Sequence, residues 1–70
     1  MFKVQNKIGL NIIKSYEDYA DGGDIESRMV DCGDVLEGEN IKSYSHFCDV
    51  KLKEGKIAVG IPVRFLEKIS

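Results

Sequence analysis

The chain has 70 residues, with 10 basic and 12 acidic side chains that give a formal net charge of −2. A chain of this length forms a single domain, so we expect one domain over residues 1–70. The nearly balanced charge excludes the broad positive field on which nonspecific nucleic-acid binding relies. No stretch approaches the ~20 apolar residues of a transmembrane helix, so we expect no membrane insertion.

Two cysteines, Cys32 and Cys48, are too few for the disulfide framework of a small secreted domain, and no signal peptide precedes them. We therefore predict a cytoplasmic protein with reduced cysteines. One disulfide between Cys32 and Cys48 stays open as an alternative if the chain is exported.

The first half of the chain predicts a strand and then a loop. Leu10 and Ile12 lie on one face, and Ile13 on the other, in a β-rich segment that runs to Tyr16. The stretch 17–27, "EDYADGGDIES", is polar and contains two adjacent glycines. We interpret it as a solvated loop, with docking of a basic partner as the alternative. It does not match the pattern of a calcium-binding loop.

Segments bounded by glycine follow in the middle of the chain. The stretch 32–41, "CGDVLEGENI", has glycines on both sides of Val35 and Leu36. Several short strands separated by glycine turns are typical of a small all-β barrel or sandwich.

The clearest element is a β-hairpin near the C-terminus. Between residues 48 and 53, apolar residues alternate with charged ones, which predicts a strand with one apolar and one charged face. Glu54–Gly55 predicts a two-residue turn, because glycine adopts the positive φ that such turns need. A two-residue turn at this position predicts the cross-strand pairs Leu52–Ile57, Val50–Val59 and Cys48–Ile61. The residues expected on the charged face are Asp49, Lys51 and Lys53.

Pro62 lacks the N–H group that a strand ladder needs, so the second strand of the hairpin should end there. The segment 62–66, "PVRFL", predicts a short turn of 3-10 helix. A last short strand should then follow and run through Ile69.

Three segments resemble the Src-homology-3 family. The stretch 15–24, "SYEDYADGGD", is similar to its tyrosine-containing opening and acidic first loop, and 32–37, "CGDVLE", to the start of its diverging turn. The stretch 60–69, "GIPVRFLEKI", resembles the glycine, proline and aromatic before its final strand. Small barrels of the KOW and Tudor types share parts of these motifs. The resemblance, from Ile13 to Ile69, implies a small five-stranded Src-homology-3-like β-barrel with a 3-10 turn before the last strand.

The resemblance also implies a hydrophobic peptide groove. Aromatic and proline side chains line this groove in the family, and acidic residues of the first loop face a basic residue of the ligand. The chain has no tryptophan, and Phe47 is the nearest substitute for the tryptophan that begins the family's third strand. The predicted partner-binding residues are Tyr16, Tyr19, Asp21, Asp24, Phe47, Pro62 and Phe65.

The lysines of the last hairpin predict a second kind of partner. Outward lysines with flanking basic and aromatic residues suit a small barrel of the KOW or Tudor type that contacts RNA or DNA. The residues of this alternative are Lys42, Tyr44, Lys51, Lys53, Lys56 and Arg64. The same lysines are also explained by protection of an edge hairpin from aggregation, which needs no partner.

The sequence offers no catalytic or metal-binding motif. His46, Cys48 and Cys32 are three potential zinc ligands, but the cysteine pair of a structural zinc site is missing. Neither a nucleophile elbow nor a phosphate-binding glycine loop is present. We expect no enzymatic activity, no metal and no cofactor.

By elimination, we predict a non-catalytic protein-protein interaction module, which acts as a small regulator, inhibitor or accessory factor by binding a partner protein. Nucleic acid is the less favoured partner. We expect a monomer or a weak homodimer, since an open edge at the final strand or at the N-terminal segment 1–6, "MFKVQN", permits dimerisation by strand addition.

Overall fold

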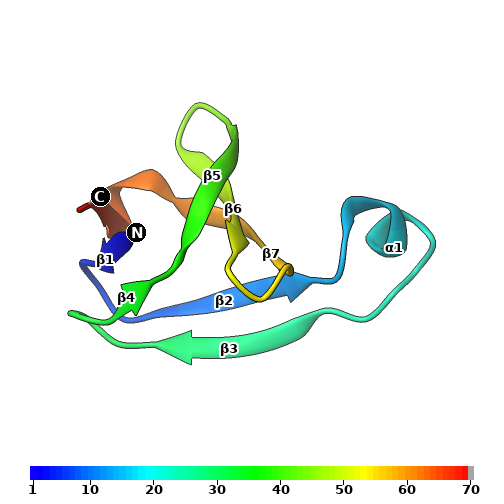
Figure 1. Ribbon diagram of the computed structural model, residues 1–70, viewed down its shortest axis with the longest axis horizontal. Helices are drawn as coiled ribbons and strands as arrows, with labels where there is room; N and C mark the ends of the chain where they lie inside the picture. The colour runs from blue at the N-terminus through cyan, green and yellow to red at the C-terminus, as the bar shows by residue number, and fades with distance from the viewer. Residues whose placement is uncertain (70) are drawn as a thin grey trace.

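Two antiparallel β-sheets form most of the protein (Figure 1). The computed structural model describes residues 1–69 and extends over 33 × 22 × 20 Å. The larger sheet has the strand order β3 (Glu26–Val30), β2 (Ile8–Ile13), β7 (Ile57–Pro62), β6 (Phe47–Leu52) and β5 (Gly38–Ser43). The smaller sheet has the order β4 (Val35–Leu36), β1 (Phe2–Val4) and β8 (Leu66–Lys68). Between strands lie helix α1 (Tyr16–Ala20) and the 3-10 helix η1 (Val63–Phe65).

The prediction of an all-β fold is confirmed, and so is the 3-10 turn before the last strand. The predicted five-stranded barrel is not confirmed, because the described strands form two separate sheets that do not close into a barrel. The N-terminal segment was expected to present an open strand edge, but residues 2–4 form the central strand of the smaller sheet and pair on both sides. In addition, the chain turns a corner at Glu37, where β4 of one sheet ends and β5 of the other begins. The last strand ends at Lys68 rather than at Ile69.

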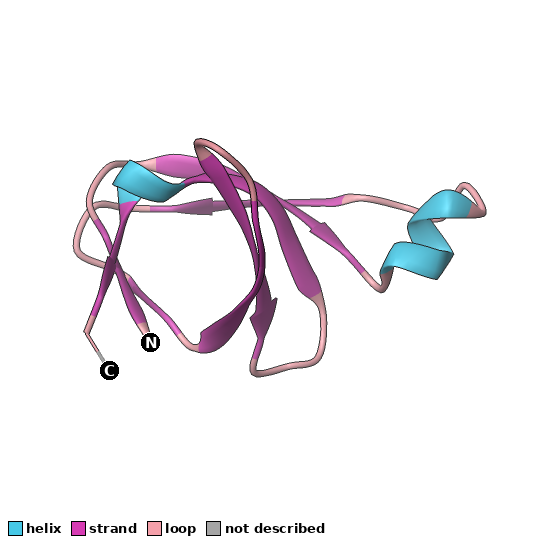
Figure 2. Ribbon diagram, turned by 90° about the horizontal axis from the view of Figure 1, so that it is seen from above, coloured by secondary structure: helices cyan, strands magenta, loops and turns pink. Residues whose placement is uncertain are grey.

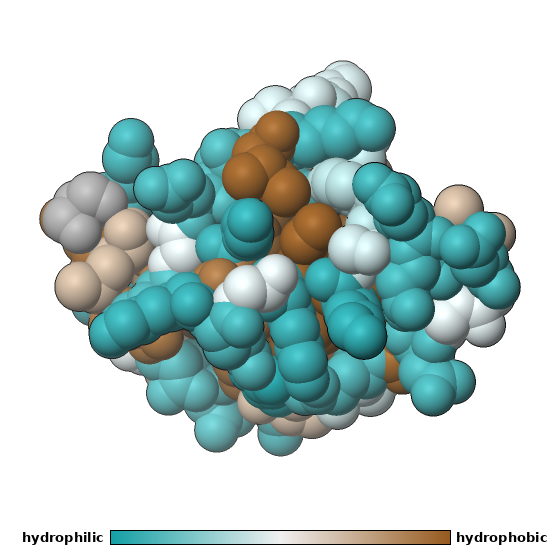
Figure 3. Space-filling model, turned by 45° about the vertical axis from the view of Figure 1, so that its right-hand side comes forward, coloured by the Kyte–Doolittle hydropathy of each residue, from teal (hydrophilic) through white to brown (hydrophobic). Residues whose placement is uncertain are grey.

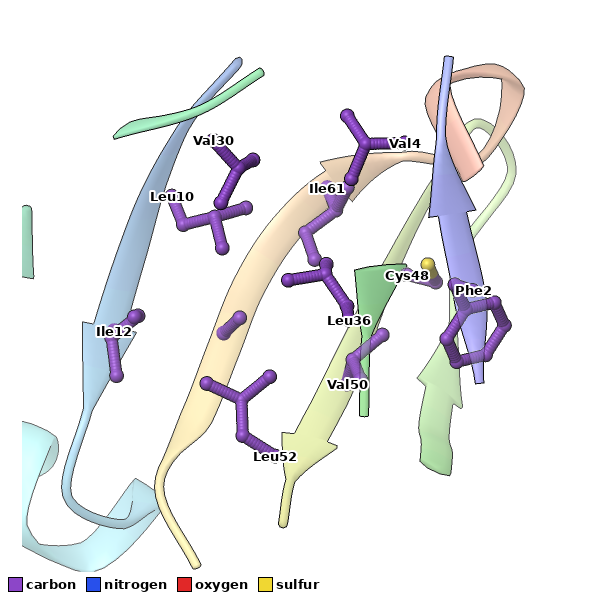
Figure 4. Packing of buried hydrophobic residues seen from close by; sticks show 11 residues of the cluster. Phe2, Val4, Leu10, Ile12, Val30, Leu36, Cys48, Val50, Leu52 and Ile61 are labelled. Atoms are coloured by element: carbon purple, nitrogen blue, oxygen red, sulfur yellow. The ribbon is translucent and has the colours of Figure 1, made fainter. Parts of the chain in front are cut away.

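The core lies between the inner faces of the two sheets (Figure 4). Figure 4 shows apolar side chains from both sheets pointing toward one another. On β6 the expected alternation is visible, since Val50 and Leu52 are buried and Lys51 is exposed. Burial of a side chain such as Val50 or Ile61 contributes about 1.5–3 kcal/mol to stability. The buried cluster consists of Phe2, Val4, Leu10, Ile12, Val30, Leu36, Cys48, Val50, Leu52, Ala58 and Ile61.

The β6–β7 hairpin differs from the expected register near its turn. The observed pairs are Cys48–Ile61, as predicted, and Val50–Ala58 and Lys51–Ile57, in place of Val50–Val59 and Leu52–Ile57. The turn has three residues, 53–55, because the N–H of Leu52 donates to the carbonyl oxygen of Lys56 over 2.8 Å. A bulge in β7 takes up the one-residue offset. It contains Gly60, whose φ of 65° is a conformation that favours glycine.

A short helix interrupts the segment that the sequence analysis interpreted as a loop. α1 begins after Ser15, whose Oγ accepts a hydrogen bond from the N–H of Asp18 over 3.0 Å. At its other end, the N–H of Gly22 donates to the carbonyl of Tyr19 over 3.1 Å, and that of Gly23 to the carbonyl of Asp18 over 2.8 Å. This is the Schellman arrangement. Five residues are too few to show a helical stripe, so only these two caps could have indicated the helix.

The helices of residues 1–69 lack the length and apolar character that a membrane-spanning helix requires.

The two ends of the described chain lie side by side. β1 pairs with β8, and the N–H of Ile69 donates to the carbonyl oxygen of Met1 over 3.1 Å. Figures 1 and 2 show both ends on the side of the molecule opposite to α1. α1 therefore projects from the end of the molecule that is farthest from the chain termini.

The glycine at the corner between β4 and β5 should be difficult to replace. A Cβ atom added at Gly38 would lie 2.5 Å from the carbonyl oxygen of Lys51 and 2.9 Å from Cγ1 of Val50. We expect Gly38→Ala to lower the free energy of unfolding by about 1–3 kcal/mol, because the backbone of β6 must move. Urea unfolding followed by far-UV circular dichroism measures the change.

Gly9→Ala is the matched control, because a Cβ atom there would meet only the flexible Sδ of Met29, at 3.2 Å. We expect a much smaller loss for this variant. Equal losses in the two variants would contradict the close approach of β5 and β6 at Gly38.

Candidate functional site

An open pocket of about 410 Å³ lies between α1 and the β5–β6 turn. Four aromatic side chains line it, and each of them is between 39% and 51% exposed. Such half-exposed rings lie at a surface where a ligand can reach them. The lining residues are Ile13, Tyr16, Tyr19, Lys42, Tyr44, Phe47, Asp49, Val59 and Gly60.

The β5–β6 hairpin places four of these residues on one face. Lys42 is opposite Asp49 in the ladder, and the N–H of Tyr44 donates to the carbonyl oxygen of Phe47 over 2.7 Å across the turn. Side chains two residues apart on a strand share a face. Since Cys48 and its inward neighbours fill the core, the four side chains point to the outer face of the sheet.

α1 supplies the opposite wall of the pocket. Tyr16 and Tyr19 are three residues apart on the helix, so their side chains lie on the same side of it. No residue of α1 is buried, and Figure 2 shows the helix projecting beyond the sheets. Figure 3, which brings this end of the molecule forward, shows a short apolar strip surrounded by mostly hydrophilic side chains.

The carboxylate of Asp49 forms the floor of the pocket and is only 1% exposed. Its Oδ2 accepts hydrogen bonds from the hydroxyl groups of Tyr16, over 2.5 Å, and Tyr44, over 3.0 Å. Its Oδ1 accepts a bond from the N–H of Gly60 over 2.9 Å. A buried carboxylate is very costly without such donors, so the three bonds make its position possible.

The burial of Asp49 corrects the expectation that it belongs to an exposed charged face of β6. Asp49 does point to the outer face, but its hydrogen-bonded tyrosines cover it there. The isolated glycine at position 60 in an apolar strand was an available signal for the bulge that supplies the third donor. No local pattern indicates that Tyr16, 33 residues away, reaches Asp49.

The hydrogen bonds decide the protonation state of this group. Burial by itself would raise the pKa of Asp49, but the bonds from Tyr16, Gly60 and Tyr44 and the positive charge of Lys42 together lower it. Burial and the carboxylate of Asp49 raise the pKa of Tyr16. The pocket therefore has a fixed negative charge beneath the neutral hydroxyl group of Tyr16.

Lys42 lies against the same two tyrosines. Its Nζ is 5.3 Å from the ring centroid of Tyr44 and 5.7 Å from that of Tyr16. These distances fit cation–π contacts. The rings are thus held by Asp49 at their hydroxyl ends and covered by Lys42 on their faces.

The structure brings together part of each predicted set. Tyr16, Tyr19 and Phe47 from the predicted peptide groove share the pocket with Lys42 and Tyr44 from the predicted nucleic-acid surface. Nothing in their spacing along the chain indicates that these residues belong to one site.

The other residues of the predicted groove do not line this pocket. Asp21 follows the last turn of α1, and Asp24 lines a separate hollow beside Lys56. Pro62 faces Phe47 in the ladder but lies outside the pocket lining, and the ring of Phe65 packs against Arg64, whose guanidinium carbon is 5.2 Å from the ring centroid.

Two of the hairpin lysines form ion pairs. Lys53 pairs with Glu37 over 3.2 Å, and Lys56 pairs with Glu26 over 3.0 Å. Arg28 contacts both Glu26, on the same strand, and Glu54, so the network joins β3 to the β6–β7 turn. Exposed pairs of this kind add little stability. They do, however, place negative charge within the surface that the alternative prediction regarded as basic.

Both cysteines are free thiols, with Cys48 buried and Cys32 exposed. Burial, with the nearby charge of Asp49, raises the pKa of the Cys48 thiol. A thiol in this environment stays protonated and is a poor nucleophile. Within residues 1–69, no cluster of three or more His, Cys, Asp or Glu side chains is placed to hold a metal ion.

No protein-family model matches the chain, and no curated protein and no solved structure shows significant similarity to it.

The Asp49 network predicts a specific acid dependence of stability. Because the fold lowers the pKa of Asp49, its contribution is complete above the ordinary aspartate pKa of about 4 and is lost as the pH falls further. Asp49→Asn keeps an acceptor for Gly60 but leaves the tyrosine hydroxyls facing an amide. We expect this variant to lose about 1–3 kcal/mol of stability at pH 7.

Urea unfolding at a series of pH values tests this expectation. The difference between the wild type and Asp49→Asn should shrink as the pH falls below about 4, because the wild-type carboxyl is then protonated too. Asp24→Asn, which removes an exposed carboxylate, is the control. A wild-type advantage that does not change with pH would show that Asp49 is not ionised in the folded protein.

Proposed function

We propose that the chain is a non-catalytic protein-interaction module that acts as a small regulator, inhibitor or accessory factor, and that the aromatic pocket is its binding surface. One observation supports this most strongly. Four half-exposed aromatic side chains converge on one pocket from α1, the β5–β6 turn and β6. Aromatic side chains are the commonest anchors of protein interfaces.

The rigidity of the pocket also supports a binding role. Tyr16 and Tyr44 cannot rotate freely, because both hydroxyls donate to the buried carboxylate of Asp49. A surface that is ordered before binding loses less conformational entropy when a partner arrives. The network therefore prepares the two ring faces for contact.

The arrangement also agrees with the Src-homology-3-like organisation inferred from sequence. The long connection between β2 and β3 faces the β5–β6 turn across the pocket, and a hairpin, a 3-10 turn and a short strand complete the chain. We propose that the fold is an open relative of that barrel. In that resemblance, the acidic first loop contributes to the peptide groove, and α1, which lines the pocket, belongs to this loop.

Nucleic acid remains the alternative partner. Lys42, Tyr44 and Phe47 combine a cation with exposed rings, which suits stacking of an unpaired base. The ion pairs of Lys53 and Lys56 and the net charge of −2 weigh against it, because such binding depends on broad positive potential. We therefore favour a protein.

Substitution of the exposed aromatics tests the proposed surface. The tagged chain is used to capture partners from a lysate of the cells in which the protein naturally occurs, with and without nuclease. Tyr19→Ala and Phe47→Ala should each weaken capture by about tenfold or more, because truncation of an aromatic anchor commonly costs over 1 kcal/mol. Both side chains are half exposed, so the fold should be retained.

Met29→Ala is the matched control, because Met29 is an apolar side chain that is 62% exposed and lies outside the pocket lining. It should leave capture unchanged. A partner that is bound equally by Tyr19→Ala, Phe47→Ala and Met29→Ala would contradict the assignment of the surface. Loss of all captured material on nuclease treatment would favour nucleic acid instead.

A further inference from the structure

The side chain of Lys42 already lies where a ligand of the pocket would contact the rings. Its ammonium group is within 6 Å of the ring centroids of both Tyr16 and Tyr44. Within residues 1–69, no carboxylate forms a salt bridge with it. The ring faces and the more distant charge of Asp49 therefore hold this ammonium group.

The backbone of β5 explains this position. The register of the β5–β6 ladder shifts between Asn40 and Lys42, and the shift brings Lys42 opposite Asp49. β5 is an edge strand on which every residue from Glu39 to Ser43 is exposed. The lysine side chain can therefore swing into water without disturbing any packed residue.

The surroundings of the rings favour positive charge in the pocket. Asp49 lies beneath the rings and is the acidic residue of the pocket lining, whereas the basic residue of the lining is Lys42 itself. A neutral ligand would gain only apolar contact from the rings. A cation would gain attraction both from the ring faces and from the carboxylate of Asp49.

Building on the proposed protein-interaction function, we propose that the pocket receives an arginine or lysine side chain of the partner protein, and that Lys42 occupies this place in the unbound protein. The incoming cation displaces Lys42 from the faces of Tyr16 and Tyr44. Lys42 is thus an internal competitor, which lowers the affinity for any cation that makes no further contact and so increases selectivity.

Nuclear magnetic resonance detects the displacement directly. The probe is Nα-acetyl-arginine amide, and the citrulline analogue, which has nearly the same shape but no charge, is the control. In the free protein, the Cε protons of Lys42 should resonate upfield of those of Lys51, because two ring faces shield them. The arginine probe should move them toward the Lys51 position, and the citrulline probe should not. Lys42 protons that do not move, or that respond equally to both probes, would overturn the proposal.

Removal of the Lys42 charge gives a second test. Lys42→Gln should bind the arginine probe about two- to fivefold more tightly, because no internal cation then competes for the rings. Lys51→Gln, which removes an exposed lysine of β6 outside the pocket lining, should bind it like the wild type. An affinity of Lys42→Gln equal to or below that of the wild type would contradict the internal competitor.

The two proposals fail in different ways. If Tyr19→Ala and Phe47→Ala abolish partner capture while the arginine probe leaves Lys42 in place, the interaction function stands and the cation site is wrong. If the probe displaces Lys42 but capture is insensitive to both variants, the cation site stands and the protein-binding assignment of the pocket is wrong.

Discussion

The outer face of this protein depends on one buried carboxylate, that of Asp49. An ionised group that is shielded from water is tolerated only when donors surround it, and here the donors come from α1, the β5–β6 turn and β7. Because these segments are distant in sequence, the same bonds that satisfy the charge also fix α1 against the sheet. The shape of the pocket and the stability of the fold are therefore coupled through Asp49.

The two faces of the larger sheet have different roles. The inner face packs aliphatic side chains against the smaller sheet, and Phe2 is the only one of the six aromatic residues that joins this core. A domain of this size buries only about 60% of its unfolded surface, so its stability is marginal. Large side chains that stay half exposed therefore leave the fold less stable than it would be if they were buried. Four of the other aromatic residues gather instead around the pocket on the outer face of the molecule.

Local patterns in the sequence predicted the elements that short-range interactions determine, and little of the tertiary contacts between them. The β6–β7 strands, the stop at Pro62 and the 3-10 turn follow from alternation and from the chemistry of proline. The register near the turn was predicted wrongly, because it combines a three-residue turn with a bulge for which the isolated Gly60 gave the local signal. All four aromatic residues of the pocket were predicted as site residues, three of them for the peptide groove and Tyr44 for the nucleic-acid surface. Its charged floor arises from contacts between distant segments, which residue spacing cannot show. The predicted acidic and proline contributors lie elsewhere for the same reason.

The pairing of β1 with β8 has a consequence for how this module can be used. Both chain ends leave the molecule together, on the side opposite to α1, whereas the pocket lies beside α1 (Figure 1). A polypeptide attached to either end, or to both, would extend away from the pocket and leave its entrance open. The architecture thus permits insertion between two other domains, or immobilisation by a tag on a surface, with the pocket directed outward.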